Sequence, residues 1–270
     1  MAEKHIDPAG ERSSHGPHHD GPAGTRPTSG PHLPGAGAGR RWGWWGIAFV
    51  VAFVASIAAG SALTVGQGLY LPEASVMQLR AFYGANGATV LVQSALQLLA
   101  VIAIFRFGYR LRAALRPTSA RASAAIGCGT AVAAGSMLAS VLCVLALLAF
   151  ATSASGAIVA GLGKAALVLG GAVHLLGSGL LITVASAVAS RSHLRPRWVF
   201  LYGRAAGPLV AASALSVVVP PLVRPEPAFR LLAAVWLVGV SIGALRGRFS
   251  GPRGSHSSSR FERAVFGGEA

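Results

Sequence analysis

The chain has 270 residues, of which 53% are hydrophobic and only 11% carry a charge, and its formal net charge is +15. Soluble domains usually contain about 25% charged residues, so this composition excludes an ordinary soluble protein and indicates a surface that faces lipid. A strongly positive chain also brings nucleic-acid binding to mind. Here the basic residues lie between long apolar runs, as they do in the cytoplasmic loops of membrane proteins, and we therefore expect no nucleic-acid partner.

Both ends of the chain are predicted to be disordered cytoplasmic tails. Residues 1–42 are rich in Pro, Gly, His and Ser, and they hold too little apolar surface to offset the entropy lost on folding. Residues 246–270 have the same character and are basic. The predicted transmembrane domain therefore covers residues 43–245.

Six apolar runs in this domain are long enough to cross a bilayer, which needs about 20 consecutive apolar residues. In chain order the runs are 44–64, 85–105, 124–150, 164–190, 198–219 and 229–245. The last run is short, and we expect its helix to extend further at the start. The fold class predicted from these runs is all-α, a polytopic membrane protein with six transmembrane helices in an antiparallel bundle.

The segment before the second run, residues 71–84, has a different pattern. Pro72 and Glu73 stand at a plausible helix start, and apolar residues then recur at helical spacing. This pattern predicts a short helix that lies at the membrane surface, although the same residues also fit an ordinary loop.

The basic residues alternate from one connecting segment to the next. Of the 23 Lys and Arg residues, all but four lie in the two tails, in the segments that follow the second and fourth runs or, for Arg204, near the start of the fifth run. The four exceptions are Arg80, Lys164, Arg224 and Arg230. The positive-inside rule then predicts a multi-pass protein of the bacterial plasma membrane with its N- and C-termini in the cytoplasm.

Small residues recur at regular spacing in two of the runs. Gly163, Gly170 and Gly177 are seven residues apart and share one helical face, and Gly239 and Gly243 form a small-xxx-small pair. Lipid tails are as apolar as leucine, so helices in a bilayer associate through close packing at such residues. We expect these five glycines to be helix-packing positions, and we expect the third and fourth spans to form a tightly packed antiparallel pair.

Four polar residues are candidates for lining the inside of the bundle. Asn86, Gln93 and Gln97 form a stripe on one face of the second span, and His174 shares the packing face of the fourth. Two interpretations are open, because polar groups in hydrocarbon need partners. The side chains either knit helices together, at about 0.6 kcal/mol for each hydrogen bond, or line a cavity for a small polar solute. His174 is either a satisfied neutral ring or a site for protons or a ligand, and we expect no Asp or Glu at membrane depth to pair with it.

The sequence holds no HExxH or GxSxG motif and no phosphate-binding glycine loop. We therefore expect a protein that is not an enzyme and has no catalytic residues, no metal site and no cofactor. The first hypothesis is a structural or interaction component of the plasma membrane, whose basic cytoplasmic surface binds anionic lipid or a protein partner. The alternative is a small-solute transporter or channel that uses the four polar residues, or a membrane partner of a separate ATPase.

One segment carries a resemblance to known proteins. SRSHLRPRWVFLYGRAAGPL, residues 190–209, has a basic turn, a Pro-Arg-Trp sequence and an aromatic run that leads into a glycine. With the Ala- and Gly-rich spans around it, the chain resembles uncharacterised six-span membrane proteins of GC-rich actinobacteria, over the second to the sixth span. The resemblance implies a six-span integral membrane protein, and because no activity is assigned to that family, it implies no catalytic residues.

Overall fold

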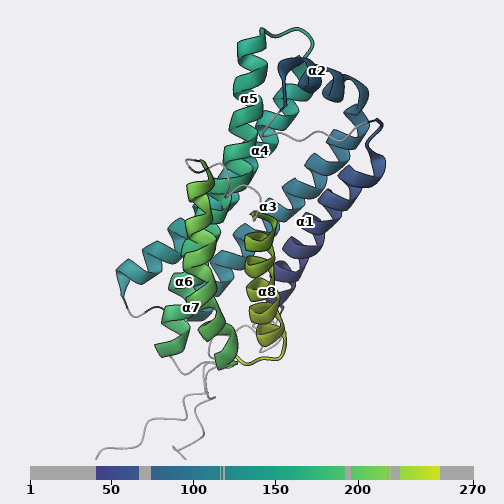
Figure 1. Cartoon of the computed structure of the whole chain (residues 1–270). Coiled ribbons are helices and arrows are strands. Elements are labelled where there is room, and N and C mark those ends of the chain that lie inside the picture. The colour runs from purple at the N-terminus through teal and green to yellow at the C-terminus, as the bar shows by residue number, and fades with distance from the viewer. Residues whose placement is uncertain are drawn as a thin grey trace, which may run out of the picture. The chain divides into compact units, whose positions relative to one another are not determined.

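The structure is a computed structural model that describes residues 41–66, 74–115, 117, 119–191, 196–217, 219 and 226–249. All of these residues belong to one compact unit, which comprises residues 36–270. Every regular element in the described ranges is a helix (Figure 1), and the predicted all-α fold is confirmed. Most of both predicted tails, together with Pro72, Glu73 and Arg224, lies outside the described residues.

Six rods in the described part of the chain are long and apolar enough to cross a membrane, as the sequence predicted. The chain is therefore an integral, multi-pass membrane protein. The spans are α1 (Gly43–Leu63), α3 (Gly87–Leu115), α4 (Ala120–Phe150), a continuous fourth rod (Gly156–Arg191), a fifth rod (Arg197–Val217) and α8 (Glu226–Leu245).

The fourth and fifth rods are each built from more than one kind of helix. The fourth consists of α5 (Gly156–Val168), a five-residue π-helical turn η2 (Leu169–Val173) and α6 (His174–Arg191). The fifth consists of α7 (Arg197–Ala212) and a 3-10 helix η3 (Ser213–Val217). The π-helical turn lies beside the candidate site described below.

Several helices extend beyond the apolar runs that predicted them, because local contacts decide where a helix ends. Ser119 caps α4, and its hydroxyl accepts a hydrogen bond from the Ala122 amide at 3.1 Å. At the end of α3, Leu111 and Leu115 are buried in the main apolar core. The helix of the last span, α8, begins at Glu226 and so starts before its apolar run, as predicted.

The predicted short helix before the second span is present as α2 (Val76–Ala85). It begins at a capping box in which Ser75 and Gln78 each accept a hydrogen bond from the other's backbone amide. Leu79 and Tyr83 are buried against α3, α4 and α5, and α2 lies near the turn that joins α4 to α5 (Figure 1). Burial raises the pKa of the Tyr83 hydroxyl to about 12, so this hydroxyl stays neutral at physiological pH.

The third and fourth spans are in direct backbone contact. A Cβ added to Gly129 of α4 would lie 2.7 Å from the Leu181 amide nitrogen and 3.0 Å from the Gly177 carbonyl oxygen of α6. A Cβ added to Gly177 would lie 3.0 Å from the Ala133 Cα of α4. The two helices run in opposite directions, since later residues of α4 face earlier residues of the fourth rod.

Glycines also join the fourth span to the fifth, an interface that the sequence did not single out. A Cβ added to Gly179 of α6 would lie 2.7 Å from both the Ala211 Cα and the Gly207 carbonyl oxygen of α7. Gly207 in turn faces the backbone of Thr183. The contacts between α6 and α7 are the most extensive between any two of the described helices, and α6 is therefore held between two close neighbours.

The remaining predicted packing glycines also lie against other elements. Gly163 faces Leu79 of α2, and Gly170 faces Ser140 of α4. In α8, Gly239 faces Val199 of α7. Gly243 faces Pro196, which precedes α7, and Phe249, which follows α8. Each of these glycines leaves no room for a side chain unless its neighbour moves.

The boundaries predicted for the two tails need a correction. Trp42 was placed in the first tail, but its side chain is only 7% exposed and packs with Phe107 and Phe249. Residues 246–249 were placed in the second tail, but they form an ordered turn whose Phe249 ring also contacts Phe200. Composition alone did not reveal these contacts, because they join residues far apart in the sequence.

We expect Gly177→Ala to destabilise the bundle by about 1–3 kcal/mol, the range for overpacking, because the new methyl group would press on the α4 backbone. The measurement is tryptophan fluorescence of the purified protein as it unfolds in detergent with increasing dodecyl sulfate. The matched control is Gly135→Ala, where nothing lies within 4 Å of the added Cβ and alanine favours the helix by roughly 0.5–1 kcal/mol. Equal destabilisation of both variants would contradict the packing described here.

Candidate functional site

The polar stripe predicted on the second span lies against α1. The Asn86 side chain accepts a hydrogen bond from the Val65 amide at 2.7 Å, and the Thr89 hydroxyl donates to the Leu63 carbonyl oxygen at 2.8 Å. Both bonds tie the end of α1 to the start of α3. The Thr89 bond also occupies the Leu63 carbonyl oxygen, one of the last four carbonyl groups of α1, which have no partner within the helix.

The two glutamines of the stripe differ from each other. The Gln93 side chain donates to the Ser56 carbonyl oxygen of α1 at 3.3 Å and fills the space above Gly60. Gln97 is half-buried, and its amide makes no hydrogen bond with any residue that the structure describes. This geometry favours the interpretation in which the stripe joins helices, with Gln97 outside the hydrogen-bonded group.

His174 lies apart from this stripe, at the start of α6. Its ring is 5% exposed, and Nδ1 is 2.9 Å from the Ala133 carbonyl oxygen of α4. The ring also stacks on Phe49 of α1, with the two centroids 6.2 Å apart. His174 forms no hydrogen bond with Asn86, Gln93 or Gln97 in the described structure, and none of the three lines the pocket that His174 lines.

The π-helical turn before His174 gives α8 a place to approach. Gly170 and Gly171 lie in this turn, and a Cβ on Gly171 would lie 2.9 Å from a carboxylate oxygen of Glu226. The Arg230 guanidinium donates to the Gly170 carbonyl oxygen at 3.1 Å. Single π-helical turns occur frequently at functional sites, and here the turn places the polar start of α8 close to His174.

Glu226 and Arg230 are one turn apart on α8 and form a salt bridge beside the π-helical turn. The Glu226 side chain is 12% exposed and that of Arg230 is 27% exposed, and the guanidinium also lies over the Phe53 ring, 5.4 Å from its centroid. The sequence led us to expect no Asp or Glu at membrane depth to pair with His174; Glu226 belongs to the first turn of α8 and pairs with Arg230 instead. Glu-Pro followed by Arg at i+4 was the missed signal, since Pro is tolerated in the first turn and Glu pairs with a residue four positions on.

A pocket of about 230 Å³ lies between α1, α6 and α8, beside this ion pair. His174, Ser178 and Arg230 supply its polar atoms, and the rest of its lining is apolar. Val54 and Leu231, which also line it, are 55% and 67% exposed, so the pocket opens at the side of the bundle that faces lipid. Its chemistry suits a small, mostly apolar molecule better than a hydrated ion.

The described cations are separated between the two ends of the bundle. One end, where α1, α4 and α7 begin and α3, α6 and α8 finish, holds ten exposed arginines: Arg41, Arg106, Arg110, Arg112, Arg121, Arg191, Arg197, Arg204, Arg246 and Arg248. We call this the arginine-rich end. The other cations that the structure describes are Arg80, Lys164 and Arg230, and Glu226 is the one acid in the described ranges. The arginine-rich end therefore carries no described acidic side chain.

The described residues contain no cluster of His, Cys, Asp or Glu that could hold a metal ion. No protein-family model matches the chain, and no curated protein or solved structure is detectably similar to it. Three features of the described structure bear on function: the helix-joining polar groups, the pocket beside the ion pair, and the arginine-rich end.

We expect Glu226→Gln to destabilise the protein by about 2 kcal/mol, because it leaves the Arg230 charge without its carboxylate. The value is below the roughly 3–5 kcal/mol for breaking a fully buried pair, since Arg230 is partly exposed. The matched variant is Glu226→Gln with Arg230→Leu, which removes both charges and should recover most of the loss. Unfolding in detergent with dodecyl sulfate measures both, and a double variant as unstable as the single one would contradict this explanation.

Proposed function

We propose that this chain is a non-enzymatic structural or interaction component of the bacterial plasma membrane, with both termini in the cytoplasm. The observation that carries the proposal is the separation of charge: among the described residues, ten exposed arginines lie at one end of the bundle and three cations toward the other. Basic residues collect on the cytoplasmic side of multi-pass proteins. The arginine-rich end is then the cytoplasmic end.

The arginines at this end lie on the surface of the bundle and not in its interior. All ten are exposed, and a Lys or Arg near an anionic leaflet contributes about 1 kcal/mol of attraction. Their partners are anionic lipid or an acidic protein surface, because the described residues at this end offer them no acid. The spans then act as a fixed support that holds this basic surface at the membrane.

The use of the interior polar groups supports the same proposal. Asn86 and Gln93 bond to the backbone of α1, His174 lies within bonding distance of the α4 backbone, and Arg230 pairs with Glu226. Groups occupied in this way stabilise one arrangement of helices, whereas a solute pathway needs polar groups that face an open cavity. Gln97 is the member of the predicted set without such a bond.

A second candidate is a small-solute transporter or channel, or the membrane partner of a separate ATPase. The pocket of about 230 Å³ beside His174 and Arg230 is the observation that favours it. Of the four polar residues predicted to line a cavity, His174 is the one in this pocket. The solute would then enter between α1 and α8 from the lipid.

The topology of the chain in cells tests the proposal. A reporter that is active only in the cytoplasm should be active when fused after Phe266 and inactive when inserted after Ser153, in the turn between α4 and α5. Both reporters are attached to the same chain, so the two fusions differ in the side of the membrane on which the reporter is expected. The proposal predicts opposite results at the two positions.

A reporter active after Ser153 and inactive after Phe266 would contradict the proposed orientation. Identical results at both positions would contradict the three spans that lie between Ser153 and Phe266. Solute uptake by liposomes that contain the purified protein, lost in His174→Gln, would support the transporter instead.

A further inference from the structure

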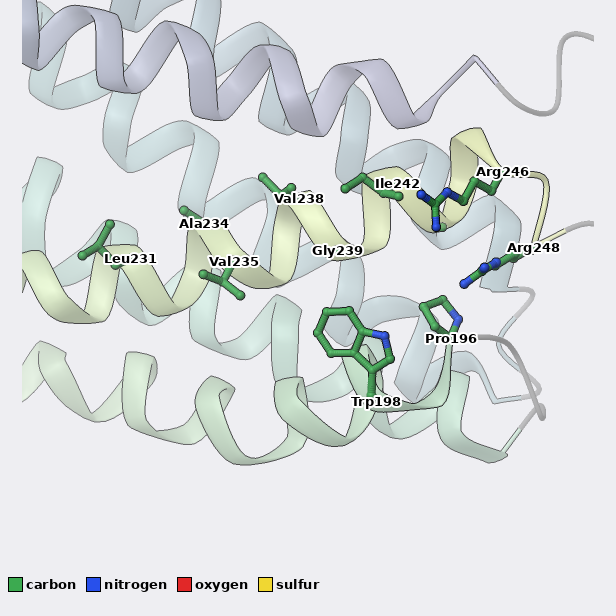
Figure 2. Close-up of a pocket in the computed structure, with 11 residues that line it drawn as sticks. Pro196, Trp198, Leu231, Ala234, Val235, Val238, Gly239, Ile242, Arg246 and Arg248 are labelled. Atoms are coloured by element: carbon green, nitrogen blue, oxygen red, sulfur yellow. The ribbon is translucent and has the colours of Figure 1, made fainter.

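A groove runs along the outer side of α8, between this helix and the start of α7 (Figure 2). Its volume is about 380 Å³, within the range of roughly 300–1,000 Å³ that small-molecule sites occupy. One wall is the apolar face of α8 from Leu231 to Ile242, and the other is formed by Pro196 and Trp198. Arg246 and Arg248 lie at one end of the groove, close to Pro196 and Trp198 (Figure 2).

The depth of the groove follows from small residues on α8. Gly239 and Gly243 are among the residues that line it, and Val199 of α7 packs on Gly239. The neighbouring Trp198 is 60% exposed, and its ring is directed toward α8, with Cη2 3.7 Å from a Cβ built on Gly239 (Figure 2). The groove is therefore a consequence of how α7 and α8 pack, and one aromatic ring stands at its edge.

The two arginines are held at the groove by the way in which α8 ends. Gly247 has a φ of 70°, which favours glycine, and its amide donates to the Ala244 carbonyl oxygen at 2.9 Å. The Arg248 amide donates to the Gly243 carbonyl oxygen at 3.1 Å. This pair of bonds is a Schellman motif, and the Phe249 ring that follows is fixed between Trp42 and Phe200. The backbone of both arginines is thus ordered.

The charge at this position lacks a protein partner. Arg246 and Arg248 are exposed, and neither forms an ion pair or a side-chain hydrogen bond with a residue in the described ranges. The one described acid, Glu226, begins the same helix at the opposite end. Guanidinium groups bind phosphate well because their planar N–H groups match its oxygens, so an anionic phosphate group complements this end of the groove.

The dimensions of the groove fit one leaflet of a membrane. Leu231 and Arg246 are separated by 15 helical residues, or about 22 Å. Half of a hydrocarbon core of about 30 Å is about 15 Å, which leaves room at the arginines for a headgroup. Trp198 lies beside them, at the depth where tryptophan is enriched in membrane proteins.

We propose that this groove binds one anionic phospholipid of the cytoplasmic leaflet. Its phosphate contacts Arg246 and Arg248, and one acyl chain lies along the apolar face of α8 from Ile242 toward Leu231. Basic pockets between transmembrane helices on the cytoplasmic side bind lipid headgroups in this manner. The inference rests on the proposed function, because the groove meets the cytoplasmic leaflet only if the arginine-rich end lies in the cytoplasm.

Native mass spectrometry of the full-length protein in neutral detergent tests the site. The probes are phosphatidylglycerol and phosphatidylcholine with identical acyl chains. The wild type should bind phosphatidylglycerol more tightly, and Arg246→Gln with Arg248→Gln should weaken that binding about 30-fold, which corresponds to two arginines at about 1 kcal/mol each. Binding of phosphatidylcholine should change little, and an unchanged elution volume in size exclusion shows that the variant is folded.

The matched control is Arg106→Gln with Arg110→Gln. These two arginines are exposed at the same end of the bundle but do not line the groove, so affinity for phosphatidylglycerol should fall less than about threefold. Val235→Trp tests the acyl-chain part, because it narrows the groove at an exposed position without a change in charge. It should weaken the binding of both phospholipids.

The site, its ligand and the proposed orientation can each be refuted by a different result. The groove is not the site if the Arg246 and Arg248 variant keeps the wild-type preference, or if the control pair loses as much affinity. The ligand is a soluble anion if inorganic phosphate competes with phosphatidylglycerol at equal concentration. The reporter fusions could show the reverse topology while only the Arg246 and Arg248 variant loses binding. This result would place the groove in the other leaflet, and it would refute the proposed orientation but not the site.

Discussion

The structure depends on the close approach of α6 to α4 on one side and to α7 on the other. Hydrocarbon gives helices no hydrophobic reason to associate, so van der Waals contact between backbones has to hold the spans together. Gly129 and Gly177 allow this contact between α4 and α6, and Gly179 and Gly207 allow it between α6 and α7. The fourth rod accordingly has the largest buried share of the six spans, 56% of its most apolar window, while α3 packs mainly on α1 and α4, and α8 packs mainly on α1 and α7.

The polar groups inside the bundle follow from this packing. Because α6 packs against α4, His174 reaches the Ala133 carbonyl oxygen. The glycines of the π-helical turn present a surface without side chains, and the start of α8 packs on it. The start of α8 brings a charged pair to that surface, and the pair is tolerated in a low-dielectric environment because each charge compensates the other and the guanidinium also bonds to Gly170. The pocket beside this pair, between α1, α6 and α8, is therefore small and mostly apolar.

The sequence predicted the parts of this structure that depend on local pattern or length. Apolar length gave the six spans, and the spacing of Gly163, Gly170 and Gly177 indicated a shared face that the structure places against α2 and α4. The ion pair of Glu226 and Arg230 was missed because the apolar run of the last span starts after it, and a helix start in a Pro-rich segment has weak signals. The π-helical turn, the groove along α8 and the burial of Trp42 and Phe249 were not predictable either, since each arises from contacts between residues far apart in the chain.

Cysteine cross-linking in native membranes tests the contact of the fourth rod with α4 most directly. On a background with Cys128→Ser and Cys143→Ser, the only native cysteines, Ser140→Cys and Gly170→Cys should form a disulfide under mild oxidation. The Ser140 Cβ lies 3.2 Å from a Cβ built on Gly170, close to the separation of roughly 3.5–4.5 Å in a disulfide. The control pair, Gly135→Cys with Gly170→Cys, should remain reduced, because nothing lies within 4 Å of a Cβ on Gly135. A cross-link in the control pair, with none between positions 140 and 170, would contradict the account.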